Sequence, residues 1–442
     1  MTENNLFKIF LKYTSFNVFG MIALSCYIFA DTLFISMGIG VDGLTAINLA
    51  LPIFSLVNGT GLMIGMGGGT KYTLAVSRDN HEEANRVFTN TLYLSAAAAS
   101  VFVVLGIFFS GNIAVLLGAN DRVMYNTEIY LKMLLLFSPA FILNNIIQCF
   151  VRNDGSPHLS MIAMIIGSMS NIVLDWLFIF PLGMGMFGAV LATCISPVLS
   201  ILITMQYFIR KKNSFHVAKT GISGKLVGGI LSSGFPSFLA EISTGIVLIV
   251  FNFLFMKTEG NTGVAAYGVI ANLWFIVVSM FTGISQGIQP IISHNYGRGN
   301  YNNVKKVLKY GLILMGIISA VIYSIMFFGA EYVASIFNSE HNDLLQFIAE
   351  EGLKIYYISC PFVGFNIIIS IFFTSTEYPV PAHIISVLRG FALIIPMAFL
   401  MSFLGGRIGL WMAFPITETI VAVIGIILYI LRNNKLRQYN KA

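Results

Sequence analysis

Residues 168–180 read SMSNIVLDWLFIF, a run that is apolar enough to lie inside a membrane and still contains Asn171 and Asp175. These two residues are four positions apart, so a helix places both side chains on one face. A carboxylate near the bilayer centre costs roughly 2.5–3.5 kcal/mol on insertion scales, and such acids usually face a partner, a cavity or an ion path. The stretch predicts a membrane helix with a functional polar face. The alternative is an acid that stays neutral, or bonds to a neighbouring helix, and serves only packing.

Composition places the whole chain in the membrane class. Of its 442 residues, 57% are hydrophobic and 10% are charged, and the mean hydropathy is +0.83. Soluble domains carry about 25% charged residues, so we expect a polytopic helical membrane protein. The net charge of +6 is therefore no sign of nucleic-acid binding. The four cysteines lie in apolar segments without CxxC spacing, so neither disulfides nor a zinc site is expected.

Twelve apolar runs predict an all-α protein with twelve transmembrane helices. We expect them at about 13–36, 44–75, 87–110, 124–151, 159–180, 185–209, 230–256, 264–293, 304–328, 345–373, 381–403 and 408–431. The longest hydrophilic break predicts an amino-terminal lobe (1–210), a cytoplasmic linker (211–225) and a carboxy-terminal lobe (226–442).

The two predicted lobes are pseudo-symmetric repeats of one another. Gly43–Val87 aligns without gaps on Gly263–Val307, at an offset of 220 residues. Further along the offset becomes 221, so that Asn145 matches Asn366. Because each lobe has six helices, both lobes enter the membrane in the same direction. The repeat is therefore parallel, with its axis along the membrane normal.

Lysine and arginine gather in one set of loops and in both tails. This set includes Arg78, Arg152, Lys219, Arg298 and Lys441. The opposite set holds only Arg122, Lys132, Lys257, Lys354 and Arg407. By the positive-inside rule, both termini and the linker are expected in the cytoplasm.

Four short motifs lie in the expected helices or at their ends. They are DTLFI at 31–35, NIVLD at 171–175, GMFGA at 185–189 followed by AT at 192–193, and QPII at 289–292 followed by NYG at 295–297. Together, on a duplicated twelve-helix chain, they resemble the multidrug and toxic compound extrusion (MATE) family. Within that family, the chain resembles the bacterial branch of MepA-type pumps.

The resemblance implies a secondary antiporter that exports cationic amphipathic compounds in exchange for H⁺ or Na⁺ by alternating access. Such a protein is not an enzyme and uses no cofactor apart from its coupling ion. Its expected partners are small cationic or amphipathic drugs and the lipid bilayer, with no nucleic acid. It is expected to work as a monomer that spans the bacterial cytoplasmic membrane several times.

The resemblance also maps a coupling site for a cation or proton onto Asp31, Asn171, Asp175 and Thr193. The residues support this mapping, because the expected helices place Asp31, Asp175 and Thr193 at a similar depth in the outer half of the bilayer. Two carboxylates, an amide oxygen and a hydroxyl suit Na⁺. They also suit a proton, because two neighbouring carboxyl groups at low dielectric do not both ionise easily. The sequence leaves the ion open, and the alternative for Thr193 is a bond to its own helix backbone or to a neighbouring helix.

Two further acids lie near the middle of expected helices, Glu241 in the seventh and Glu418 in the twelfth. Both are candidates for a substrate site or a second ion site. The alternative is packing through hydrogen bonds, and for Glu418 it is pairing with Arg389. Neither acid is repeated in the other lobe, because Glu241 aligns with Met21 and Glu418 with Pro197.

Other functions fit the sequence less well. A lipid-linked saccharide flippase of the same superfamily needs several arginines inside helices to face a pyrophosphate, and only Arg389 qualifies. An intramembrane aspartyl protease needs a GxGD segment, which neither Asp31 nor Asp175 has. An ATP-driven pump needs a P-loop, and the sequence contains none.

Overall fold

The computed structural model describes residues 3–338 and 342–439, and within these ranges the chain forms helices and no strands. Lys441 and both chain ends, which the charge pattern assigns to the cytoplasm, lie outside the described residues. Nine helices of the described chain are long and apolar enough to cross a membrane. The bent pair α4 (Met124–Leu136) and α5 (Ser138–Asn153) forms a tenth span with a 47° bend.

Two long helices run across a break between spans. α8 (Gly224–Gly297) contains two spans, whereas α14 (Ile394–Tyr439) contains the last span and, up to Gly406, the end of the preceding span, which begins in α13 (Pro379–Val387). Each has a glycine at positive φ, Gly260 at 66° and Gly406 at 54°, where a side chain would be strained. The ring centroids of Phe255 and Tyr267 lie 5.3 Å apart, whereas twelve residues of straight helix would separate them by about 18 Å. The chain therefore reverses within α8. Dividing α8 and α14 adds one span each to the ten, which confirms the twelve predicted.

The described chain packs as two compact units. The first unit consists of Met1–Ile242 and Gln286–Val304, and the second of Ser243–Ser285 and Lys305–Ala442. Residues 226–242 and 286–304 thus pack with the first unit, although the sequence assigns both to the carboxy-terminal lobe. The lobe boundaries drawn at the linker stay a prediction.

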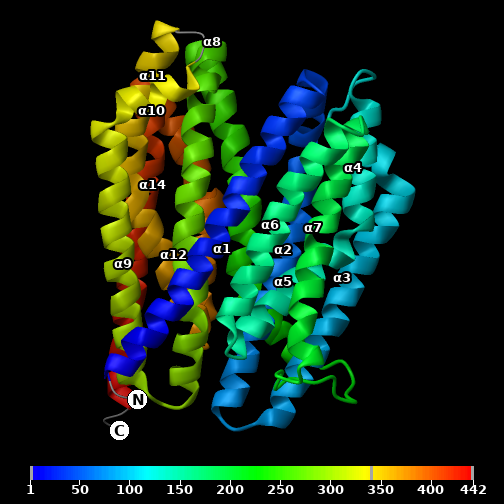
Figure 1. Ribbon diagram of the computed structural model, residues 1–442. Coiled ribbons are helices and arrows are strands. Elements are labelled where there is room, and N and C mark those ends of the chain that lie inside the picture. The colour runs from blue at the N-terminus through cyan, green and yellow to red at the C-terminus, as the bar shows by residue number, and fades with distance from the viewer. Residues whose placement is uncertain (1–2, 339–341, 440–442) are drawn as a thin grey trace. The chain divides into compact units, whose positions relative to one another are not determined.

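The first unit is built around α1 (Glu3–Gly38), α2 (Val41–Ser77), α3 (His81–Leu116), α6 (Pro157–Ile179) and α7 (Gly185–Ile209). α6 packs along both α1 and α7, while α2 packs against α3 and α5 (Figure 1). The glycines of α2 allow neighbouring segments to pack closely against this helix. A Cβ on Gly67 would strike the backbone of Ile230, and a Cβ on Gly68 would strike Thr91.

The linker is anchored to the first unit, where Figure 1 shows it as the green loop at the lower ends of α3 and α7. Phe215 is fully buried, and its ring packs 4.6 Å from that of Phe88 and 5.4 Å from that of Phe150. Four backbone N–H groups of the linker donate to side-chain oxygens at 2.8–2.9 Å, namely Ser214 to Asp154, His216 to Asn85, Ala218 to Thr89 and Ser223 to Asn90.

The second unit combines part of α8, α14 and, from Lys305 onward, α9 (Tyr301–Phe328). It also contains α10 (Ala330–Phe337), α11 (Asp343–Tyr356), η1 (Tyr357–Ser359), α12 (Cys360–Ser375), α13 (Pro379–Val387) and η2 (Leu388–Ala392). α12 packs against α13 and α14. An aromatic core fills the unit, in which Trp411 lies 4.3 Å from the Phe255 ring. η2 is a π-helical turn, a local widening that often occurs at functional positions.

Candidate functional site

Two buried carboxyl groups meet in the first unit, as the sequence predicts. Asp31 on α1 is 5% exposed and Asp175 on α6 is 0% exposed, and their carboxyl groups are close enough to interact directly. Oδ1 of each carboxyl group has no hydrogen-bond partner within the described chain. Two neighbouring carboxyl groups at low dielectric do not both ionise easily, so a proton shared between them would lower the cost of burying the pair.

The carboxy-terminal ends of α1 and α6 hold the two acids together. Asp31 lies seven residues before the end of α1 and Asp175 four residues before the end of α6, or about 10 and 6 Å along the helix axes. A Cβ on Gly38 would strike Ile179, so the end of α1 lies directly against the end of α6. This close contact fixes the depth at which the two carboxyl groups face each other.

Asn171 and Thr193 complete the predicted set. In the amide orientation that satisfies both ends of Asn171, Nδ2 donates to Oδ2 of Asp175 at 3.0 Å, and Oδ1 accepts from the backbone N–H of Thr193 at 3.3 Å. The hydroxyl of Thr193 donates to the carbonyl of Ala189 on its own helix at 3.1 Å. All four predicted residues therefore lie at one site, but Thr193 contacts Asn171 through its backbone in this arrangement.

Two tyrosines near the acid pair were not predicted from the sequence. Tyr27, one turn before Asp31 on α1, and Tyr130, on α4, both interact electrostatically with Asp31 and Asp175. Tyr130 is almost fully buried. A tyrosine in an apolar run gives no signal that it lies near two acids. The four-residue spacing between Tyr27 and Asp31 is nevertheless the helical spacing that brings side chains together.

Glu241 also lies in the first unit, at the end of a chain of amides. Nδ2 of Asn58 on α2 donates to Oε1 of Glu241 at 2.9 Å, and Nδ2 of Asn145 on α5 donates to Oδ1 of Asn58 at 2.9 Å. These donors are neutral, so they solvate the carboxylate without cancelling its charge. The structure thus leaves Glu241 as an acid without a basic partner among the described residues.

Glu418 lies in the second unit and has a different environment. Both of its carboxylate oxygens accept from Nε of Arg389 at 2.9 Å, and Oε2 also accepts from Nδ2 of Asn366 at 2.7 Å. The Glu418 side chain is 2% exposed and that of Arg389 is 19% exposed. The pairing that the sequence suggested as an alternative is present, and a role for Glu418 in binding stays a prediction.

Arg152 is a buried basic side chain whose described hydrogen-bond partners include no acid. Arg152, which the charge pattern assigns to a loop, lies in the last turn of α5 and is 2% exposed. Its Nη1 donates to Oδ1 of Asn17 at 3.0 Å and to Oε1 of Gln286 at 2.8 Å. Helices of the first unit cover the residue that sequence alone treats as solvated.

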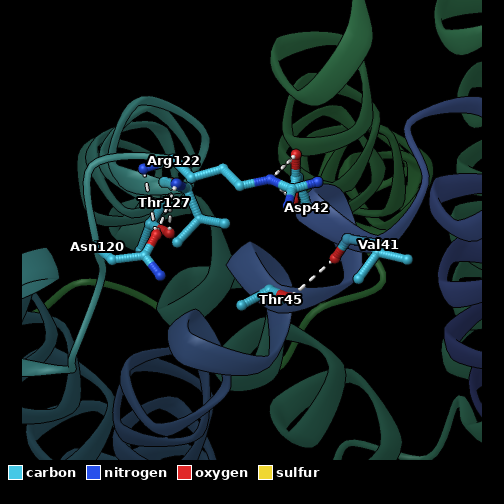
Figure 2. Close-up of polar contacts among 7 residues, drawn as sticks. Val41, Asp42, Thr45, Asn120, Arg122 and Thr127 are labelled. Atoms are coloured by element: carbon cyan, nitrogen blue, oxygen red, sulfur yellow. Dashed lines mark hydrogen bonds and ion pairs between the residues drawn. The ribbon is translucent and has the colours of Figure 1, made fainter.

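At the end of α2 that the charge pattern assigns to the outside, an exposed ion pair joins α2 to the loop before α4. Nε of Arg122 lies 2.8 Å from Oδ1 of Asp42, and the side chains are 75% and 33% exposed. Figure 2 shows this pair beside Asn120, whose Oδ1 accepts from the backbone N–H of Arg122 at 3.2 Å. Asp42 is therefore a solvated acid of the same unit, unlike Asp31 and Asp175.

Comparison with protein families gives a match over most of the chain. The MatE family model matches residues 17–177 and 236–400. The multidrug export protein MepA of Staphylococcus saprophyticus is 30% identical over 393 residues, which cover 88% of this chain and 86% of that protein. MepA of Staphylococcus haemolyticus is 28% identical over 434 residues, or 98% of this chain and 95% of that protein.

Solved structures share the fold. One is described as an outward-facing conformation of a multidrug resistance MATE family transporter, with a TM-score of 0.91 at 21% identity over 98% of this chain and 96% of the other. Another is a transporter of the MOP superfamily from Pyrococcus furiosus, with a TM-score of 0.90 at 22% identity over 97% of this chain and 96% of the other.

Proposed function

Because the chain belongs to the MatE family, we propose that it is a secondary antiporter that exports cationic amphipathic drugs in exchange for protons. It works as a monomer in the bacterial cytoplasmic membrane, by alternating access. The staphylococcal relatives are named multidrug export proteins, which supports drugs as its substrates. The Asp31–Asp175 pair is its coupling site.

The contact between these two carboxyl groups is the observation that carries the choice of ion. A shared proton lets both side chains remain buried against each other. The amide nitrogen of Asn171 donates to Asp175, and its oxygen accepts from the backbone N–H of Thr193. A ligand set for Na⁺ would need the amide oxygen turned toward the carboxyl groups. In this orientation it is turned away from them.

The same contact explains how protonation would drive movement. Loss of the proton leaves two carboxylates against each other at low dielectric, where like charges repel strongly. α1 and α6 must then separate at their outer ends or admit a cation between them. The proton and a cationic drug would therefore favour different arrangements of these two helices. Antiport requires this, because the two must not be bound at the same time.

Ethidium efflux from proteoliposomes tests the function and the ion together. The purified protein is given a proton gradient or a sodium gradient, each imposed alone. We expect efflux with the proton gradient and none above background with sodium. Efflux with sodium alone would overturn the proton assignment, and no efflux under either gradient would overturn drug export.

Orientation is part of the same proposal. The charge pattern places Lys219 in the cytoplasm and Glu259 outside. Single cysteines at these positions, in a variant whose four native cysteines are replaced, can be labelled in intact cells with an impermeant maleimide. We expect labelling at 259 and none at 219, and the reverse result would invert the topology.

A further inference from the structure

We propose that a groove in the second unit binds one anionic phospholipid, with its phosphate at two lysines and an acyl chain along apolar walls. The groove has a volume of ≈ 360 Å³, within the roughly 300–1,000 Å³ typical of ligand sites. Three helices line it, α9 with Lys305, Leu308, Lys309, Leu312 and Ile313, α12 with Phe365 and Ile369, and α14 with Ile426 and Tyr429.

The α9 wall has a basic end and an apolar end. Its five lining residues follow a spacing of three and four, so they form one continuous face of the helix. Lys305 and Lys309 come first, within the opening turns of α9, and Leu312 and Ile313 follow deeper along the same face. This order matches a lipid, whose charged phosphate is joined to apolar chains.

The charge of the two lysines is not cancelled within the described chain. Both are exposed, and neither is part of an ion pair there. Arg432, another basic residue of the second unit, is already engaged, since its Nη2 donates to the carbonyl of Thr376 at 3.2 Å and its guanidinium lies 5.1 Å from the Phe372 ring. Lys305 and Lys309 are thus the cations that this groove offers to an external anion.

The internal repeat provides an independent argument. At the offset of 220, Lys305 corresponds to Asn85, and Lys309 corresponds to Thr89, two residues beyond the gapless match. On α3, Asn85 and Thr89 accept from backbone N–H groups of the linker. On α3 this helix face carries acceptors, and backbone donors of the linker cover it. On α9 the corresponding face carries the cationic donors Lys305 and Lys309. A phosphate, which only accepts from such donors, complements the second version of this face.

The predicted orientation places the basic end of the groove at the membrane leaflet that contains anionic lipids. The start of α9 follows the Arg298 loop, which the charge pattern places in the cytoplasm. The cytoplasmic leaflet carries anionic lipids, and basic pockets between membrane helices on this side bind anionic head groups. The inference concerns binding alone and does not depend on which ion drives export.

Native mass spectrometry of the intact protein in detergent tests this site, with dioleoyl phosphatidylglycerol and dioleoyl phosphatidylcholine as probes. We expect the anionic lipid to bind the unaltered protein more tightly. The variant Lys305→Gln/Lys309→Gln should bind it about tenfold more weakly. The control Lys212→Gln/Lys219→Gln removes the same charge from exposed linker positions and should keep the original affinity. Binding of phosphatidylcholine should be equal in all three proteins, which also shows that each is folded.

A second variant tests the apolar wall. Ile426→Trp keeps both lysines and fills the groove, so it should also weaken binding of phosphatidylglycerol. Equal affinity in the lysine variant and its control would overturn the proposal, as would an Ile426→Trp variant that binds like the unaltered protein. Competition by millimolar inorganic phosphate that abolishes lipid binding would overturn the lipid as the ligand, because it would leave the apolar wall without a role.

Discussion

Asp175 and Glu418 are both fully buried acids in membrane helices, and the difference lies in what faces them. Asp175 contacts a second carboxyl group and an amide, whereas Glu418 contacts the guanidinium of Arg389. An acid paired with arginine is neutral as a pair and needs no further ion. An acid paired with an acid is stable only while a proton or a metal cation lies between the two. Burial alone therefore does not identify a coupling site, and the sign of the nearest charge does.

The largest expected effect is at the acid pair. Asp31→Asn and Asp175→Asn should each abolish proton-driven export of every drug, because one carboxyl group alone no longer forms a pair that binds and releases the shared proton. The measurement is ethidium and multi-drug efflux from proteoliposomes at matched protein content. Asp42→Asn is the matched control, because it removes an exposed acid of the same unit. Full activity in Asp31→Asn would remove the pair from the mechanism.

The next effect concerns stability at the ion pair. Arg389→Gln should lower the free energy of unfolding by about 3–5 kcal/mol, because it leaves the Glu418 carboxylate buried without its cation. The double variant Arg389→Gln/Glu418→Gln should recover most of this loss. Thermal unfolding in detergent measures both. Normal export by the double variant would make Glu418 a structural acid, while a folded double variant without export would make it part of a binding site.

Glu241 tests the intermediate case, an acid that faces only neutral donors. Glu241→Gln keeps an acceptor for Asn58 and removes the charge, so we expect several-fold weaker export of cationic drugs and little change for neutral ones. Efflux of drugs of different charge, compared at equal expression, provides the measurement. Loss of transport for all drugs, neutral ones included, would assign Glu241 to coupling instead.

The smallest effect is expected at the exposed pair of Asp42 and Arg122. Such surface pairs contribute about 0–1 kcal/mol, and Arg122 is 75% exposed. Asp42→Asn should therefore shift the unfolding temperature little, and raised salt should remove the difference from the unaltered protein. A loss of stability as large as that of Arg389→Gln would show that solvent exposure does not determine how much each ion pair contributes to stability.

Hydropathy predicted most of the fold, because each span needs about twenty apolar residues whatever its neighbours are. The internal breaks were less predictable. The bend between α4 and α5 coincides with Pro139 at the start of α5, a local signal that hydropathy does not register. Hydropathy likewise does not register the π-helical turn at 388–392. Arg152 illustrates the same limit, because its burial depends on Asn17 and Gln286, each more than a hundred residues away.

The acid pair was predictable because acids are rare and costly in apolar helices, and because the family resemblance grouped Asp31 with Asp175, a grouping that their similar depth supported. The repeat also indicated it, since Asp31 aligns with Phe251 and Asp175 with Pro396 in the other half. Hydrogen-bond roles were not predictable. The orientation of Asn171 and the contact through the backbone of Thr193 depend on ångström-scale placement of α6 against α7.

The first unit is not contiguous in sequence, and this has a consequence for how the protein is made. Arg152 bonds to Gln286, and Nε2 of Gln289 donates to the hydroxyl of Thr70 at 3.0 Å. A ribosome must therefore add more than 130 residues after Arg152 before Gln286, one of the two amide partners of that buried cation, exists. The first six spans enter the membrane early but reach their final packing only after the eighth has been synthesised. Premature termination near the linker would leave a half-protein in which Arg152 lacks Gln286 and keeps only Asn17 as an amide partner.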